Sequence, residues 1–323
     1  MMPQDASGDI LDQGVSWARA SSYFALLEIL RSPDAANEAW ATAEVHGGMA
    51  ASRVHSIGRI VGRTDVDDKA FMLARKHVLE GFTQLRHDDV ILEKGTVGYP
   101  TRLAETPDAP QFLFVRQQAN VLDLPSLSVV GTRQASQDGR DRARRLAHLL
   151  ARRGIVVCSG LAAGIDEAAH LGCLEAGGIT IAVLGTPLTR VYPKEHAALQ
   201  ERIGFVGAVV SQFHPKSKTL PLCFPLRNAT MSGLSLGTVV IEASETSGAL
   251  VQARKALQQG RKLFIPRSAL DSDRLRWPRQ YVNRGAHVFA TIDELVSVLE
   301  TENLVPQRDL VPTAATAVGL RAS

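Results

Sequence analysis

The sequence predicts an α/β protein in which a doubly wound, mostly parallel sheet follows a small all-helical domain. From residue 89 onward, short runs rich in Val, Ile and Leu alternate with helical patterns about every 25 residues, which is the rhythm of strand–helix–strand units. Most of these runs are continuously apolar, as expected of parallel strands that are buried on both faces. The 26 glycines and only 5% aromatic residues suit tight turns between short elements.

The apolar runs define the expected strands, which are residues 90–92, 112–115, 127–130, 155–158, 179–184, 208–210, 238–241, 262–265 and 287–289. Helices are expected between the later strands at residues 138–153, 165–176, 194–203, 228–234, 248–259 and 292–299. Ahead of them, residues 15–85 carry apolar side chains at three- and four-residue spacing, as in Trp17, Ala20 and Phe24, which predicts helices.

Three segments follow from this pattern. Residues 1–88 form the predicted helical domain, although residues 1–12 carry no pattern of their own and are expected to be loose. Residues 89–300 form the predicted sheet domain. Residues 301–323 lack a periodic apolar face and are expected to be a disordered tail.

Composition narrows the classes of protein. The formal net charge of +3 is too small to indicate a partner by itself. No apolar run approaches a membrane span, and the first residues lack the order of a signal peptide, so we expect a cytoplasmic protein away from membranes. The three cysteines are widely spaced, which argues against disulfides and metal sites and predicts small buried residues: Cys158, Cys173 and Cys223.

Common catalytic motifs do not occur in the sequence. It contains neither GxGxxG nor GxxxxGK[ST], which removes the standard dinucleotide enzymes and the P-loop ATPases. It also contains neither HExxH nor GxSxG, so zinc hydrolysis and an α/β-hydrolase triad are unsupported. We expect no catalytic residue, no metal and no cofactor.

Four expected strands end in turns rich in glycine and hydroxyl residues, at residues 131–133, 159–166, 185–187 and 242–248. The carboxyl ends of parallel strands meet at one edge, where such folds bind ligands, and free backbone N–H groups there would attract an anion. Any one of these turns can serve chain folding alone, but four on one edge favour a phosphate-rich ligand. Asp166 and His170 are four residues apart on one helix, which favours a local side-chain pair over acid–base chemistry.

Residues 211–228 combine positive charge with an aromatic side chain, in what we expect to be a long loop at the crevice. Lys216, Lys218 and Arg227 could contact phosphates, while Phe224 could stack on a base, as in single-stranded nucleic-acid binding. The alternative, in which Phe224 fills the core and the lysines are merely solvated, is about equally compatible with the sequence. The arginines of residues 140–153 accompany one apolar face and are expected to form a solvated surface.

Four linked segments resemble the DprA/Smf DNA-processing family: SVVGTRQASQDG at 128–139, VVCSGLAAGIDEAAHLG at 156–172, FPLRNATMSGLS at 224–235 and VVIEASETSG at 239–248. The resemblance spans residues 90–300, and we expect no C-terminal winged helix of the kind that many members carry. It implies a Rossmann-like sheet domain that binds single-stranded DNA without catalysis, forms a homodimer, and delivers the strand to a RecA-type recombinase during natural transformation.

The resemblance also implies which residues contact DNA. They are Gly131, Thr132, Arg133, Ser159, Gly160, Gly164, Lys218, Phe224, Arg227, Asn228, Ser247 and Gly248, and the charge of Lys216 adds that residue to these candidates. Three positions depart from the family pattern, namely Gln212, Ala229 and Arg267, and we expect them around the crevice. A nucleotide sensor or a nucleotide N-glycosidic hydrolase of a related fold is the alternative, with Glu242 and Glu245 as its acid or base.

Overall fold

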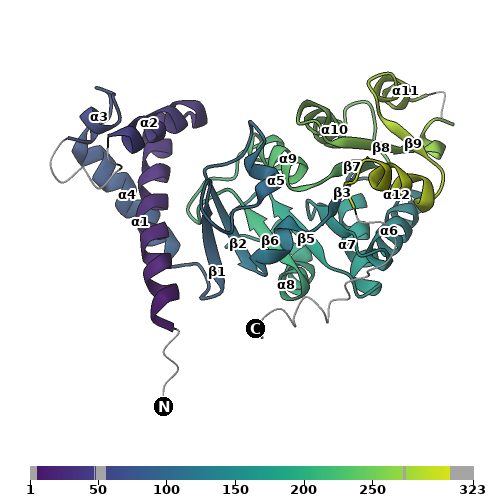
Figure 1. The fold of residues 1–323 in the computed structure, drawn as a ribbon, viewed down its shortest axis with the longest axis horizontal. Helices are drawn as coiled ribbons and strands as arrows, with labels where there is room; N and C mark the ends of the chain where they lie inside the picture. Colours follow the sequence, from purple (N-terminus) through teal and green to yellow (C-terminus); the bar gives the residue numbers. More distant parts are fainter. Residues whose placement is uncertain (1–5, 47, 49–55, 272–273, 306–323) are drawn as a thin grey trace, which may run out of the picture.

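The computed structural model of the protein describes residues 6–46, 48, 56–271 and 274–305 (Figure 1). Within them, nine strands form one sheet in the order β1-β2-β6-β5-β4-β3-β7-β8-β9. The strands are β1 Asp89–Glu93, β2 Phe112–Gln117, β3 Ser126–Val130, β4 Val156–Ser159, β5 Thr180–Leu184, β6 Ala208–Ser211, β7 Gly237–Val240, β8 Lys262–Pro266 and β9 His287–Phe289. Every predicted strand is present, so the predicted fold class is confirmed.

The helices alternate with these strands. They are α1 Ala6–Leu30, α2 Pro33–Val45, α3 Ile57–Ile60, α4 Asp68–Phe82, α5 Thr101–Ala104, α6 Gln137–Arg152, α7 Ile165–Glu175, α8 Ala197–Val206, α9 Cys223–Leu234, α10 Gly248–Gln258, α11 Trp277–Val282 and α12 Ile292–Thr301. The described residues also form the short 3₁₀ helices η2 Ala119–Asp123, η3 Lys194–His196 and η4 Arg267–Ala269.

Two predicted boundaries were wrong and one helix was missed. Helix α1 begins at Ala6, inside the segment expected to be loose, because an established helix gains one hydrogen bond for each residue that it adds. Helix α9 begins at Cys223 rather than at 228, since Pro225 lies in the first turn, where no backbone N–H is needed. Helix α11 was not predicted at all. The expected tail lies outside the described residues beyond residue 305.

The order in which the chain adds strands to the sheet reverses beside β3. Strands β4, β5 and β6 extend from β3 on one side, and β7, β8 and β9 extend on the other, all of them parallel to their neighbours. Strands β1 and β2 are antiparallel and complete one edge. In such a sheet the chain leaves β3 and β7 in opposite directions, which opens a crevice beyond their carboxyl ends.

The two faces of the sheet carry different helices. One face packs on α5, α9, α10 and α11, and the other packs on α6, α7, α8 and α12. The N-terminal helices share the second face at the β1–β2 edge, where Phe24 and Trp40 contact Phe112 of β2 with ring centroids 5.8–6.0 Å apart. One continuous apolar cluster therefore joins the helical segment to the sheet.

Candidate nucleic-acid interface

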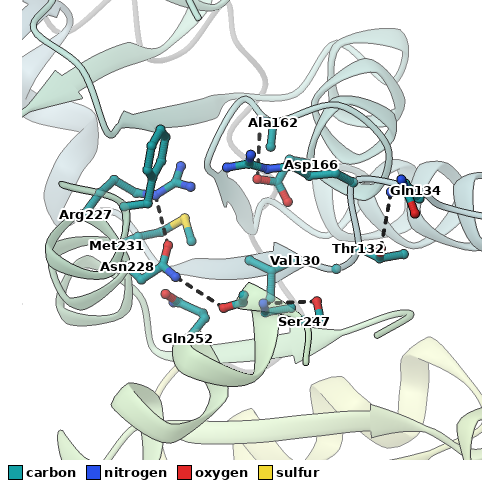
Figure 2. A pocket seen from close by; sticks show the side chains of 15 residues that line it. Val130, Thr132, Gln134, Ala162, Asp166, Arg227, Asn228, Met231, Ser247 and Gln252 are labelled. Atoms are coloured by element: carbon teal, nitrogen blue, oxygen red, sulfur yellow. Dashed lines mark hydrogen bonds between the residues drawn. The ribbon is translucent and has the colours of Figure 1, made fainter. Parts of the chain in front are cut away.

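A pocket of about 420 Å³ lies beyond the carboxyl ends of β3, β4 and β7, at the point where the strand order reverses. Figure 2 shows its walls, with Arg227, Asn228 and Met231 on α9, Thr132 and Gln134 after β3, and Ser247 and Gln252 at α10. Residues far apart in the sequence thus converge where the topology predicts a ligand site.

An aromatic and cationic platform stands at the mouth of this pocket. The guanidinium of Arg133, which is exposed, lies over the ring of Phe224 at 5.2 Å from its centroid. Tyr192 approaches the same ring at 5.9 Å and is 49% exposed. Gly185 makes room for the ring, because a Cβ there would lie 2.7 Å from Phe224 Cδ1. Phe224 therefore stays half-buried, with one cation and one further ring beside it.

Arg227 has a different environment from Arg133. It is only 6% exposed, and its Nη1 donates to the carbonyls of Gly160 at 2.6 Å and Val183 at 2.8 Å. Its Nε donates to Asn228 Oδ1 at 3.0 Å. Burial lowers the pKa of this guanidinium from its ordinary value. Arg227 lines the pocket floor and joins three elements there, whereas we expected it on an open loop.

The predicted anion site after β4 is occupied by the protein's own carboxylate. Asp166 Oδ2 accepts from the backbone N–H of Gly160 at 3.2 Å and from that of Ala162 at 3.4 Å. Burial raises the pKa of Asp166, and the nearby Arg227 charge opposes that rise. Among the described residues, Asp166 does not form the predicted hydrogen bond with His170. His170 Nδ1 lies 2.7 Å from Thr180 Oγ1 instead.

The remaining predicted positions divide between the pocket and its supports. Gly131, Thr132, Asn228, Ser247 and Gly248 line the pocket with Arg133, Phe224 and Arg227, and Gly160 lines the neighbouring hollow below Phe224.

Ser159 and Gly164 line neither the pocket nor the neighbouring hollow. Ser159 is buried and its Oγ donates to Val129 O at 2.7 Å, which ties β4 to β3. Gly164 has φ +85°, and a Cβ there would lie 2.6 Å from Thr132 O.

The two lysines do not join Arg133 and Arg227 in the pocket, contrary to our expectation. Lys216 Nζ donates to Glu80 Oε2 of α4 at 2.8 Å, on the helical segment. Lys218 is exposed and lines neither hollow among the described residues.

The three departures from the family pattern also lie outside the pocket. Gln212 accepts from Thr230 Oγ1 at 2.5 Å, Ala229 is buried within α9, and Arg267 is exposed directly after β8.

The two glutamates proposed for acid–base chemistry have structural partners. Glu242 accepts from Ser136 N at 3.0 Å and from Ser136 Oγ at 2.6 Å, at the start of α6. Glu245 Oε1 accepts from Arg276 N at 2.6 Å and from Trp277 N at 3.2 Å, at the start of α11. Neither carboxylate lines the pocket. Both glutamates hold helix N-termini, as is typical of capping side chains.

The sequence did not single out several residues of the pocket. Tyr192 was not predicted, although an exposed aromatic side chain in a loop after β5 is a signal that could have found it. Asp166 was noted only for a pairing with His170. Gln134, Met231 and Gln252 line the pocket and carry no recognisable signal in the sequence.

Other chemistries find little support in the described part of the chain. The three cysteines are buried and unpaired, and their predicted burial is confirmed. Among the described residues, no group of three His, Cys, Asp or Glu side chains is placed to hold a metal ion. No described helix has the length and apolar character that crossing a membrane requires.

Comparison with known proteins places the chain in a family. The sequence profile described as DNA recombination-mediator protein A matches residues 91–300. DNA processing protein DprA of Streptococcus pneumoniae is 41% identical over 174 residues, which cover 54% of this chain and 61% of the relative. Protein Smf of Escherichia coli is 38% identical over 203 residues, which cover 62% and 54%. The chain thus matches little more than half the length of these relatives.

Solved structures agree with this assignment. DNA processing protein A from Streptococcus pneumoniae has a TM-score of 0.71 at 27% identity, over 87% of this chain and 97% of that one. DNA processing protein A from Helicobacter pylori, described for its single-stranded DNA binding mode, has a TM-score of 0.58 at 25% identity, over 66% and 96%. The motifs, the sheet topology and these matches agree, and the chain belongs to the DNA recombination-mediator protein A family.

Proposed function

We propose that this protein binds single-stranded DNA in the pocket at the ends of β3, β4 and β7. The observation that carries the proposal is the platform at its mouth, where Arg133 lies 5.2 Å from the ring centroid of Phe224. Such a pair offers a cation to a phosphate and an aromatic face to a base, the two contacts that single-strand binding uses. The structure of DNA processing protein A from Helicobacter pylori, which is described for its single-stranded DNA binding mode, supports the same ligand.

The charges of the pocket also favour this ligand. Arg133 is exposed at the mouth and Arg227 lies in the floor, so both cations face the space that the strand would enter. The carboxylate of Asp166 is held by two backbone N–H groups, which reduces its repulsion of a phosphate. Since Glu242 and Glu245 cap helices, we propose a binding protein without a catalytic step.

The cellular role follows from family membership and is part of the proposal. The protein would act as a homodimer in the cytoplasm, without a cofactor, in the recombination of DNA taken up by natural transformation. It would deliver the bound strand to a RecA-type recombinase. A strand-exchange assay with a RecA-type recombinase tests this role. The protein should accelerate exchange on single-stranded DNA that has first been coated with a single-strand-binding protein.

Fluorescence anisotropy with a labelled oligothymidylate at two salt concentrations tests the binding site. Phe224→Ala should weaken binding by about 5- to 150-fold, since stacking contributes about 1–3 kcal/mol per base. Arg133→Ala should weaken it and also reduce the dependence of log K on log salt by about 0.7, the value for one phosphate contact on a single strand.

Arg152→Ala is the matched control, because Arg152 is an exposed arginine at the C-terminal end of α6, on the opposite edge of the sheet. It should bind like the parent protein. No binding by the parent at low salt would refute the proposed function, and equal losses in Arg152→Ala and Arg133→Ala would refute the proposed site. Release of a free base from a nucleoside monophosphate, abolished by Glu242→Gln, would instead support a hydrolase.

A further inference from the structure

Three exposed arginines follow β8 at the same edge of the sheet as the pocket. Arg267 comes directly after the strand, and Arg274 and Arg276 precede α11. We call these three side chains the arginine strip. None of them lines the pocket, and the sequence did not associate Arg274 or Arg276 with any ligand.

Strand register places the strip beside the pocket. The N–H of Thr132, a pocket residue, donates to Glu242 O at 2.7 Å, so the ends of β3 and β7 lie side by side. Val239 of β7 pairs with Phe264 of β8, and continuing this register by three residues along each chain places Glu242 level with Arg267. Two strand spacings of about 4.8 Å therefore separate the backbone of Arg267 from that of Thr132, or about 10 Å in total.

Hydrogen bonds fix the second part of the strip to the pocket loop. Glu245 accepts from the N–H groups of Arg276 and Trp277, and Trp277 Nε1 donates to Ala243 O at 2.9 Å. Trp277 is 1% exposed and anchors this segment. Helix α11, which carries it, lies beside α10 (Figure 1). The loop that holds Arg276 continues to Ser247 and Gly248, which line the pocket.

Within the described residues, ion pairing distinguishes the arginine strip from the arginine-rich α6 segment. Ion pairs bind Arg142, Arg144 and Arg153 of the arginine-rich α6 segment to carboxylates. Within the described part of the chain, no ion pair involves Arg267, Arg274 or Arg276. Two acidic residues, Asp271 and Asp273, lie between Arg267 and Arg276 in the sequence, and Asp273 is outside the described residues. A cluster of unpaired guanidinium groups at a ligand edge is suited to phosphates.

We propose that the arginine strip binds backbone phosphates of the single strand after it leaves the pocket. The bound strand would then cross the ends of β3, β7 and β8 in turn. At about 3.4 Å per stacked nucleotide, the 10 Å between Thr132 and Arg267 corresponds to about three nucleotides. This inference rests on the proposed function, because it extends the same binding site to a longer strand.

Oligonucleotide length provides the test. We would measure the affinity of the parent and of the triple variant Arg267→Ala, Arg274→Ala, Arg276→Ala for oligothymidylates of about 3 and about 15 nucleotides. The short strand fills the pocket alone and should bind both proteins equally. The long strand should bind the variant about tenfold more weakly, with a salt dependence lower by up to about 2, which is about 0.7 for each contact.

Two further variants separate phosphate binding from other effects. A triple Arg→Lys variant keeps the charges and should retain the affinity for the long strand. The triple variant Arg145→Ala, Arg152→Ala, Arg202→Ala removes the same charge from exposed positions on α6 and α8 and should bind like the parent. Equal long-strand affinity and salt dependence in the strip variant and the parent would overturn the inference. No binding of either strand by the parent would refute the proposed function instead.

Discussion

Replacing Arg227 by methionine tests whether Arg227 stabilises the pocket or contacts the ligand directly. The substitution removes the donors for Gly160 O, Val183 O and Asn228 Oδ1. A hydrogen bond to a charged group contributes about 1.5–3 kcal/mol, so three of them amount to about 5–9 kcal/mol before any offset. Methionine avoids the cost of burying a guanidinium, which is several kcal/mol. We therefore expect Arg227→Met to lower the free energy of unfolding by about 3 kcal/mol.

Urea denaturation measures this loss. Arg133→Met is the matched control, because Arg133 is exposed and its substitution should change stability by less than about 0.5 kcal/mol. Arg227→Met also leaves the buried Asp166 carboxylate without the neighbouring positive charge, so adding Asp166→Asn should recover part of the loss. A protein with Arg227→Met that unfolds like the parent but no longer binds DNA would refute the reasoning, because Arg227 would then act as a ligand contact alone.

Two other side chains allow predictions about stability. Burial lowers the pKa of His170 to about 3, so between pH 6.5 and about 3 the unfolded chain binds a proton that the folded chain does not. Acidification from pH 6.5 to 4.5 should therefore cost about 2.3 kcal/mol through this group, and urea denaturation of His170→Gln should show a shallower acid loss. Glu242→Ala should lower the free energy of unfolding by about 1–2 kcal/mol through the start of α6, with oligothymidylate affinity within twofold of the parent. A Glu242→Ala protein of parental stability would contradict its role as a cap.

The strands of the sheet were predictable because burial on both faces leaves a direct mark on the sequence. Residues 127–130 were expected as a strand, and β3 is Ser126–Val130, all of it buried. The location of the pocket was predictable for a related reason. Once the strands are parallel, their carboxyl ends must share one edge, and Gly131, Gly160 and Ser247 follow three of them.

The roles of individual site residues could not be predicted, because their partners are remote in the sequence. Arg227 bonds to carbonyls 67 and 44 residues away, so its sequence neighbourhood does not show that it is buried. Lys216 pairs with Glu80, which is 136 residues away, across two elements that the sequence assigned to separate domains. The sequence suggested that the backbone N–H groups of Gly160 and Ala162 were available to a ligand. It could not show that the Asp166 carboxylate folds back to accept from both of them.

The ion pair of Lys216 with Glu80 indicates how the N-terminal helices support the pocket. Residues 212–218 connect β6 to the segment leading into α9, which carries Phe224 and Arg227. Helix α4 holds that connection through Lys216 and Glu80, and α1 holds it through Glu28, whose carboxylate lies 3.4 Å from His214 Nε2. His214 is buried against Phe24, with ring centroids 5.1 Å apart.

The approach to α9 is therefore fixed from behind by helices that share no residue with the pocket. Because the proposed stacking on Phe224 depends on the position of α9, we expect the N-terminal helices to influence binding, although none of their described residues lines the pocket.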